Sequence, residues 1–296
     1  MDVVAIVNPI SGAGLDPTVA NRRVAFIRDE LSRRGERVSI HLTERGGHAA
    51  ELAAAAAAAH ADLVIVWGGD GTLNEAGGAL AGTATALAMI PAGSGNGLAH
   101  ALRVPKDPGR ALELALTAPD RPMDVGVIGS RRFLNVAGIG ADARIARVFN
   151  QRARGRRGRW PYLVIGVREG CRYRAADYRV RLDGTDVHSR ALLIAFANGR
   201  EYGMGAILAP SAELDDGLLE AFVIEDRSVL ARFRDARHLI GGTVLKAPGV
   251  VQKKVRRAVV ESAAPIEYHV DGEPGCAEGR LEIGVLPRAL RVKGAV

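Results

Sequence analysis

Three glycine-rich turns carry the residues of this sequence that are best suited to binding phosphate groups. They are Asn8–Gly14, Gly68–Thr72 and Pro91–Gly97, and each follows a run of apolar residues. Glycine lets backbone N–H groups converge on an anion. A helix that starts directly after such a turn adds free N–H donors and a partial positive charge. The pattern predicts phosphate binding, although the first turn taken alone is at least as consistent with an ordinary turn.

Asp70 is the acidic residue in the second turn, where a carboxylate would repel a phosphate. A Mg²⁺ ion between the carboxylate and the phosphate would remove that repulsion, because Mg²⁺ prefers oxygen ligands. The simpler interpretation is that Asp70 caps the helix that follows. We favour phosphate or metal binding, since three glycines and Thr72 surround Asp70 in the sequence.

The segments around these turns predict a doubly wound parallel sheet. Buried-type apolar runs alternate with segments of helical periodicity, an order typical of α/β domains. In such sheets ligands bind beyond the carboxyl ends of the strands, where all three turns fall. The expected strands are 3–7, 37–42, 62–67 and 84–90, and the expected helices are 17–34, 47–60 and 73–80.

From Met123 onward the pattern changes to short strand-like runs, which predict a mainly antiparallel β-sandwich. We expect one domain at 1–122 and a second at 123–296, with a last strand at about 288–293 that could return to the first domain. The expected strands here are 124–128, 132–136, 178–182, 191–197, 218–224, 255–262 and 265–270. The expected helices are 141–150, 161–168 and 229–239.

The composition limits the classes of partner. The net charge is +7 and the sequence pI about 9.8, which favours anionic ligands or simply reflects solubility. Aromatic residues make up only 4%, which argues against nucleic acid as a partner. Cys171 and Cys276 have no metal-type spacing, and no signal peptide or apolar run of about 20 residues is evident. We therefore expect a cytoplasmic protein that meets any lipid at the inner membrane surface.

The common nucleotide-binding signatures are absent. The sequence has no G-x-x-x-x-G-K-[ST] motif, no G-x-G-x-x-G after the first strand, and no protein-kinase signature set. A phosphate site built from these turns must belong to another class.

Four motifs in order point to that class. They are Asn8-Pro9-x-Ser11-Gly12, Gly68-Gly69-Asp70-Gly71-Thr72, Pro91-x-Gly93-Ser94-x-Asn96 and Asp271-Gly272-Glu273. Together they resemble the diacylglycerol kinase catalytic-domain family, which includes bacterial lipid kinases, sphingosine kinases and ceramide kinases. Segments 135–142 and 209–219 also look like family blocks, so the resemblance covers nearly the whole chain.

The resemblance implies an ATP-binding α/β domain, a lipid-binding β-sandwich, and ATP and Mg²⁺ as ligands. Glu273 would be the general base, and Asp70 would also act in catalysis. Magnesium would be held by Asp216 with main-chain oxygens near Glu213 and Leu218. The residues implied at the ATP site are Asn8, Ser11, Thr43, Gly68, Gly69, Asp70, Gly71, Thr72, Leu73, Asn74, Ser94 and Asn96.

Glu273 fits the role of base on chemical grounds, because phosphoryl transfer needs one group to accept the hydroxyl proton. An ordinary Asp-Gly hairpin turn is the alternative reading. Asp142 matches a position that recognises the lipid headgroup in sphingosine kinases, or is a carboxylate at a helix start. Gly97 stands where many bacterial diacylglycerol kinases have Asp, which leaves open whether the lipid is a diacylglycerol or a sphingoid.

We therefore expect a lipid kinase. Two alternatives remain: an NAD-kinase-like enzyme that uses Asp70 as base, and a catalytically silent nucleotide- or lipid-binding regulator. The basic segment 151–160, which ends in Trp160, predicts docking on an anionic membrane, with a solvated loop as the other reading. A homodimer is a further expectation.

Overall fold

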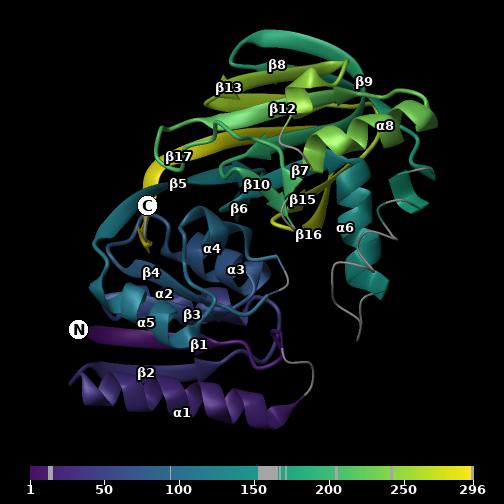
Figure 1. Ribbon diagram of the computed structural model, residues 1–296. Coiled ribbons are helices and arrows are strands. Elements are labelled where there is room, and N and C mark those ends of the chain that lie inside the picture. Colours follow the sequence, from purple (N-terminus) through teal and green to yellow (C-terminus); the bar gives the residue numbers. More distant parts are fainter. Residues whose placement is uncertain are drawn as a thin grey trace. The chain divides into compact units, whose positions relative to one another are not determined.

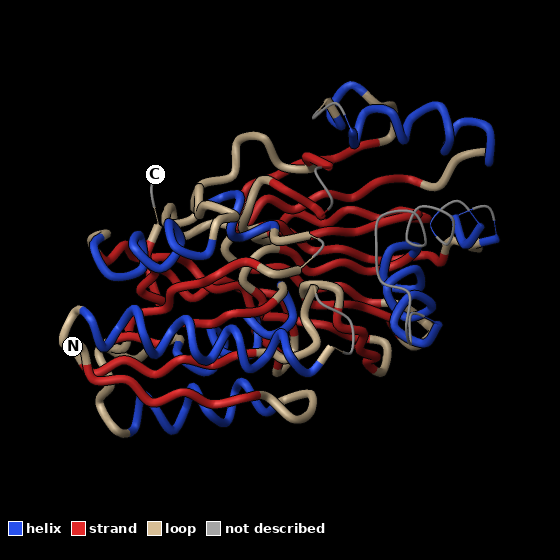
Figure 2. Tube along the Cα trace, turned by 60° about the horizontal axis from the view of Figure 1, so that its bottom comes forward, coloured by secondary structure: helices blue, strands red, loops and turns tan. Residues whose placement is uncertain are grey.

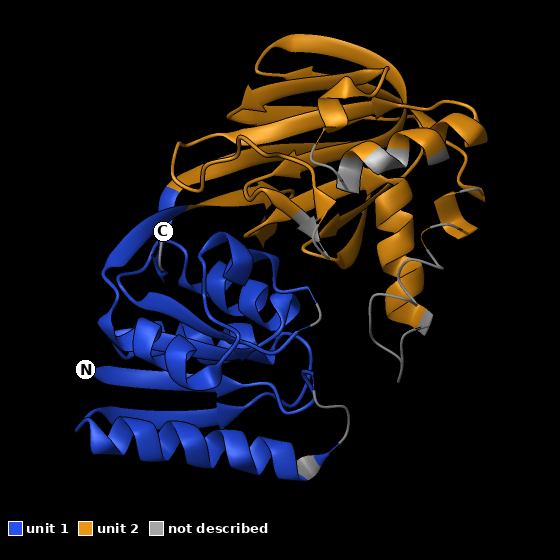
Figure 3. Cartoon of the chain, in the orientation of Figure 1, with its two compact units in different colours: residues 1–123, 288–296 blue, residues 124–287 orange. Residues whose placement is uncertain are grey.

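The computed structural model describes residues 1–12, 16–93, 95–152, 166, 168–170, 172–203, 206–240 and 243–294. The chain forms two compact units (Figure 3). Unit 1 comprises residues 1–123 and 288–296, and unit 2 comprises residues 124–287. Each unit is described by itself.

Unit 1 is built on a parallel sheet with the strand order β4-β3-β1-β2. Every residue of β3 is buried, as expected for a strand covered on both faces. The end of β17 adds a further parallel strand beside β4, with Arg291 opposite Ala86. The strands of this sheet are β1 (Asp2–Val7), β2 (Arg37–Leu42), β3 (Leu63–Gly68), β4 (Ala86–Pro91) and the last residues of β17 (Arg280–Lys293).

Helices cover both faces of this sheet, and Figure 2 shows helices on either side of the strands. Right-handed crossovers place α1 on one face and α2 and α3 on the other, where α2 and α3 pack together. Asp16 caps α1 by accepting the Thr18 N–H. The helices are α1 (Pro17–Arg33), α2 (His48–Ala58), α3 (Asp70–Leu80), α4 (Gly97–Ala101) and α5 (Pro108–Thr117).

Unit 2 is mainly antiparallel, and its strand path is β16-β15-β7-β9-β8-β14-β17 (Figure 1). β12 pairs with β9 and β13, and β5 pairs with β17 and β6. Inward-facing apolar residues such as Phe133, Ile194 and Phe196 form the core. The strands are β5 (Asp120–Ile128), β6 (Arg131–Phe133), β7 (Val136–Gly140), β8 (Ala176–Leu182), β9 (Thr185–Ala197), β10 (Glu201–Gly203), β11 (Ala206–Ile207), β12 (Leu219–Glu225), β13 (Val250–Val255), β14 (Arg257–Glu261), β15 (Ile266–Val270) and β16 (Glu273–Ala277).

Unit 2 also contains the helices α6 (Ala141–Arg152) and α8 (Val229–Ile240) and the 3₁₀ turn η1 (Val244–Lys246). The predicted fold class, a parallel α/β domain followed by a mainly antiparallel β-sandwich, is confirmed. The helix expected at 161–168 falls largely outside the described residues.

Three local predictions were wrong. The expected strand 132–136 is divided between β6 and β7, because the backbone N–H groups at the break bond to the Asp271 carboxylate. The expected strand 255–262 is broken at Arg256, whose N–H and that of Arg257 bond to Asp183. Helix α3 begins at Asp70, three residues before the expected start at 73.

Candidate functional site

The three glycine-rich turns follow β1, β3 and β4 and meet at one edge of the unit 1 sheet. A Cβ atom placed on Gly93 would lie 2.8 Å from the Gly69 Cα, and one on Gly12 would lie 2.2 Å from the Ala92 carbonyl oxygen. A real Cβ cannot approach backbone atoms so closely, so glycine is required at both positions. The turns therefore pack backbone against backbone, and this part of the predicted phosphate site is brought together.

Asp70 joins the second turn to the third. Its Oδ2 accepts the Asn96 N–H at 2.7 Å, and its Oδ1 accepts the Gly97 N–H at 2.9 Å. Burial raises the pKa of Asp70, while these N–H groups act in the opposite direction. Gly69, and not Asp70, occupies the N-cap position of α3. The carboxylate instead holds the start of α4.

Asn8 closes the first turn and connects it to the second. Its Nδ2 donates to Thr72 Oγ1 at 2.8 Å, and its Oδ1 accepts the Ile10 N–H at 3.1 Å. Both ends of the amide are therefore engaged, one within the first turn and one with the second turn. This is a structural role, and it places Asn8 and Thr72 side by side at the predicted ATP site.

Asn96 has the same kind of role in the third turn. Its backbone is left-handed, with φ of 57°. Its Oδ1 accepts the Gly93 N–H at 2.8 Å, and its Nδ2 donates to the Gly93 carbonyl at 2.7 Å. Ser94, also predicted at the ATP site, lies outside the described residues.

Thr43 lies after β2, where its N–H donates to the Val7 carbonyl at 2.9 Å. Of the other predicted ATP residues, Gly68 is the last residue of β3, and Gly71, Leu73 and Asn74 lie in the first turns of α3. The side chains of Leu73 and Asn74 are buried within unit 1.

Arg23 supports the first turn and was not identified from the sequence. Its guanidinium donates to the Asn8 carbonyl at 2.9 Å and to the Ser11 carbonyl at 2.7 Å. It also lies 5.4 Å from the centre of the Trp67 ring. Burial lowers the pKa of Arg23. No motif marks this residue, because an arginine in a helical segment normally reads as solvent-exposed.

In unit 2 the Asp271–Gly272 pair forms the hairpin turn between β15 and β16. Both residues have positive φ, 46° and 87°, as a two-residue turn of this kind requires. The Asp271 carboxylate accepts the N–H groups of Leu134, Asn135 and Val136 at 2.7, 3.1 and 2.8 Å. Asp271 therefore fixes the turn that carries Glu273.

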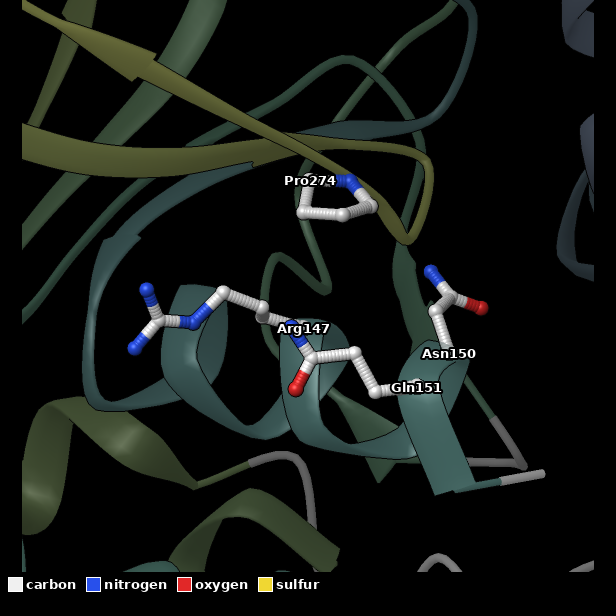
Figure 4. Close-up of a pocket in the computed structure, with 4 residues that line it drawn as sticks. All are labelled: Arg147, Asn150, Gln151 and Pro274. Carbon is white, nitrogen blue, oxygen red and sulfur yellow. The ribbon is translucent and has the colours of Figure 1, made fainter.

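Glu273 itself is exposed. Its main-chain carbonyl accepts Arg131 Nη1 at 3.2 Å, and the preceding Gly272 carbonyl accepts Asn150 Nδ2 at 2.9 Å. A cavity of about 340 Å³ adjoins this turn, lined by Arg147, Asn150, Gln151 and Pro274 (Figure 4). A carboxylate on a fixed turn beside a cavity can serve as a base toward a bound hydroxyl.

The residues predicted to bind magnesium lie in the loop before β12. Asp216 Oδ2 pairs with Lys254 Nζ at 2.7 Å, and Asp216 Oδ1 accepts the Leu218 N–H at 3.0 Å. Asp124 fixes the same loop by accepting the Gly217 N–H at 2.6 Å. Within the described ranges, no cluster of three or more acidic, histidine or cysteine side chains is placed to hold a metal.

The donor set of this loop nevertheless fits Mg²⁺ by its chemistry. One carboxylate and main-chain oxygens are hard ligands of the kind that Mg²⁺ accepts alongside water and substrate phosphates. Lys254 is the competing cation, and a metal at Asp216 must displace its ammonium group. Glu213, also in the predicted set, is exposed.

Asp142 lies in the first turn of α6 and is only 6% exposed. Its Oδ2 lies 2.9 Å from His269 Nε2, and its Oδ1 accepts the Ala143 N–H at 2.8 Å. The predicted headgroup residue is thus hydrogen-bonded within unit 2. His269, its partner, was not identified from the sequence.

Comparison with known proteins agrees with this architecture. Residues 2–128 match the model of the diacylglycerol kinase catalytic domain, and residues 135–294 match that of the YegS C-terminal NAD kinase beta sandwich-like domain.

Individual relatives agree as well. A protein of Chromohalobacter salexigens named as a probable YegS-like lipid kinase is 31% identical, over 86% of this chain and 83% of its own. The diacylglycerol kinase of Mycobacterium tuberculosis is 32% identical, over 98% and 94%. A solved structure from Bacillus anthracis, described as a candidate diacylglycerol kinase, superimposes with a TM-score of 0.79 at 25% identity and covers 99% of this chain and 97% of its own.

The fold, the turns and these matches together define the class of the protein as an ATP-dependent lipid kinase. The chain belongs to the diacylglycerol kinase catalytic-domain family, in the branch that carries a YegS-type C-terminal domain. In the described part of the chain, no helix is both long and apolar enough to cross a bilayer.

Proposed function

We propose that this enzyme transfers the γ-phosphate of MgATP to a hydroxyl group of a lipid, with Glu273 as the general base. The observation that carries the proposal is the close backbone packing of the three turns, locked by the bonds from Asn96 and Gly97 to Asp70. Such packing presents glycine N–H groups to an anion at the carboxyl ends of parallel strands.

Each group has a defined part in the proposed reaction. The backbone N–H groups of the turns bind the phosphates, and the lipid oxygen attacks the γ-phosphorus. The bond from the γ-phosphorus to the bridging oxygen breaks, and ADP leaves with the electron pair. The Glu273 carboxylate takes the hydroxyl proton. When bound at Asp216, Mg²⁺ would neutralise charge on the phosphates.

The acceptor in this proposal is a diacylglycerol or a sphingoid-type lipid. Diacylglycerol is named by the Mycobacterium tuberculosis relative. The Gly97 N–H donates to Asp70, a bond that any residue except proline could make here, so it does not discriminate between the two acceptors. Asp142 is our candidate for contact with the acceptor headgroup, while its Oδ2 keeps the bond to His269.

Two alternatives are less well supported. In an NAD-kinase-like enzyme Asp70 would be the base, but both of its oxygens accept backbone N–H groups. A silent regulator would have no use for Glu273, and only an activity measurement distinguishes it from an enzyme.

Incubation of the purified chain with labelled ATP, Mg²⁺ and a lipid panel tests the proposal. The panel comprises diacylglycerol, monoacylglycerol, sphingosine, ceramide and phosphatidylglycerol. We expect label on one acceptor class. ATP consumption without label in any lipid, or label in NAD when NAD is offered as a separate acceptor, would overturn the proposal.

We further propose that the enzyme reaches its substrate at an anionic membrane surface. The charge of +7 supports this, since each cation near such a surface contributes about 1 kcal/mol. The basic segment 151–160 lies outside the described residues from 153 onward. If replacement of its arginines leaves co-sedimentation with phosphatidylglycerol vesicles unchanged, the segment is not the contact.

A further inference from the structure

His269 is a buried histidine whose two ring nitrogens both have hydrogen-bond partners. It lies in β15, is 5% exposed, and precedes the Asp271–Gly272 turn by two residues. Nε2 lies 2.9 Å from Asp142 Oδ2, and Nδ1 accepts the Gly272 N–H at 3.2 Å. The ring therefore connects helix α6 to the turn that carries Glu273.

The partners determine the tautomer. A backbone N–H can only donate, so Nδ1 must be unprotonated, and the ring is then neutral with its proton on Nε2. Nε2–H in turn requires an acceptor, which is Asp142 Oδ2. Asp142 is held by the Ala143 N–H on its other oxygen. Asp142 thus selects the one form of His269 that can bond to Gly272.

Strand β7 is shaped around this pair. Gly138 lies opposite His269 in the sheet register. A Cβ atom on Gly138 would lie 1.9 Å from Asp142 Oδ2 and 2.6 Å from His269 Nε2. The pair therefore occupies space that exists only because position 138 is glycine.

Both peptide groups of Gly272 are anchored. The Gly272 N–H is bound by His269 Nδ1, and the Gly272 carbonyl accepts Asn150 Nδ2 at 2.9 Å. The orientation of these peptides sets the direction of the Glu273 side chain, and glycine, with its permissive backbone, cannot set it alone.

We propose that His269 is a positioning residue for the phosphoryl-transfer step: held by Asp142, it orients the Gly272 peptide and thereby aims the Glu273 carboxylate at the lipid hydroxyl. The inference rests on the proposed function, in which Glu273 is the base. It assigns His269 no contact with substrate.

Two substitutions at His269 separate its two hydrogen bonds. His269→Asn keeps an acceptor near the Nδ1 position, and His269→Gln keeps a donor near the Nε2 position. We expect His269→Gln to retain the melting temperature of the wild type but to lose about 10-fold or more in kcat, since a small misplacement can cost up to about 100-fold. We expect His269→Asn to keep kcat within about 3-fold and to melt at a lower temperature, because Asp142 loses its donor. The KM for ATP should stay unchanged in both.

The positioning role would be overturned if His269→Asn lost kcat while His269→Gln kept it. It would also be overturned if kcat in both variants fell only in proportion to the folded fraction. Glu273→Gln serves as the reference variant. If it stays active, the base itself is misassigned, whereas an inactive Glu273→Gln with equal kcat in the two His269 variants rejects only the role of His269. If one His269 variant does not fold, the kcat of the other is compared with the wild type.

Discussion

Asp70 and Asp271 are each held by backbone N–H groups from distant parts of the chain. The sequence marked both residues, because each lies in a motif with glycine. Their partners could not be predicted, since Asn96 is 26 residues from Asp70 and Leu134 is 137 residues from Asp271. No periodicity links such positions. Nearly every residue also has a backbone N–H, so the residue type does not show which N–H groups will bond to a carboxylate.

The raised pKa of Asp70 predicts a pH dependence of stability. Burial raises this pKa above the ordinary value of about 4, so the folded chain resists ionisation more than the unfolded chain does. The contribution of Asp70 to stability is therefore present below about pH 4 and is lost as pH rises through the higher folded value. Urea unfolding of wild type and Asp70→Asn across pH 4 to 8 should show the wild type losing stability relative to the variant. A constant difference would contradict the assignment.

Lys254 predicts a measurable competition with magnesium. Its ammonium group pairs with Asp216 and would have to leave for a metal to bind there. Lys254→Met should therefore lower the Mg²⁺ concentration that gives half-maximal activity. Lys253→Met is a suitable control, because Lys253 bonds to Leu182 and Thr185 instead. An unchanged requirement for Mg²⁺ would place the metal elsewhere.

At the scale of elements, the alternation of strand and helix predicted the parallel sheet, because continuous apolar runs mark strands buried on both faces. Helices α4 and α5 were missed. α4 has five residues and begins in a glycine-rich turn, so its sequence reads as loop. The break between β6 and β7 was missed because Leu134 is apolar and continues the strand pattern, while its N–H bonds to Asp271.

The Asp271 turn predicts a large stability effect from one small change. Asp271→Ala removes the acceptor of three N–H groups, and each unsatisfied buried donor costs about 1–3 kcal/mol, so we expect a loss of about 3 kcal/mol or more. Urea unfolding measures this. Asp215→Ala, an exposed aspartate, should be near neutral. A similar small effect at both positions would show that the turn is not anchored by Asp271.

The packed turns predict that Gly93→Ala damages the phosphate site. Its Cβ would lie 2.8 Å from Gly69 Cα, so the second and third turns must separate. We expect ATP affinity to fall at least 10-fold by calorimetry. Gly46→Ala, which has open space and ordinary φ, is the matched control and should bind ATP normally. Normal binding by Gly93→Ala would mean that the turns do not form the ATP site.

At the scale of the whole molecule, the order of the motifs along the chain was the informative signal. The order of the motifs indicated the family without knowledge of the strand pairing. Each motif lies at the end of a strand or in a turn. Strands β5 and β17 each contain residues of both units, and this could not be predicted from the sequence. The change to short strand-like runs from Met123 onward predicts a second domain, but only strand pairing shows that Arg291 and Val292 join β4.

Measurement of kcat and ATP affinity for Glu273→Gln tests the account most directly. General-base catalysis is worth about 100- to 10,000-fold, so kcat should fall by at least 100-fold while the Kd for ATP stays within about 2-fold. Glu278→Gln, an exposed glutamate after the same hairpin, should match the wild type. Turnover by Glu273→Gln at close to the wild-type rate would contradict the account.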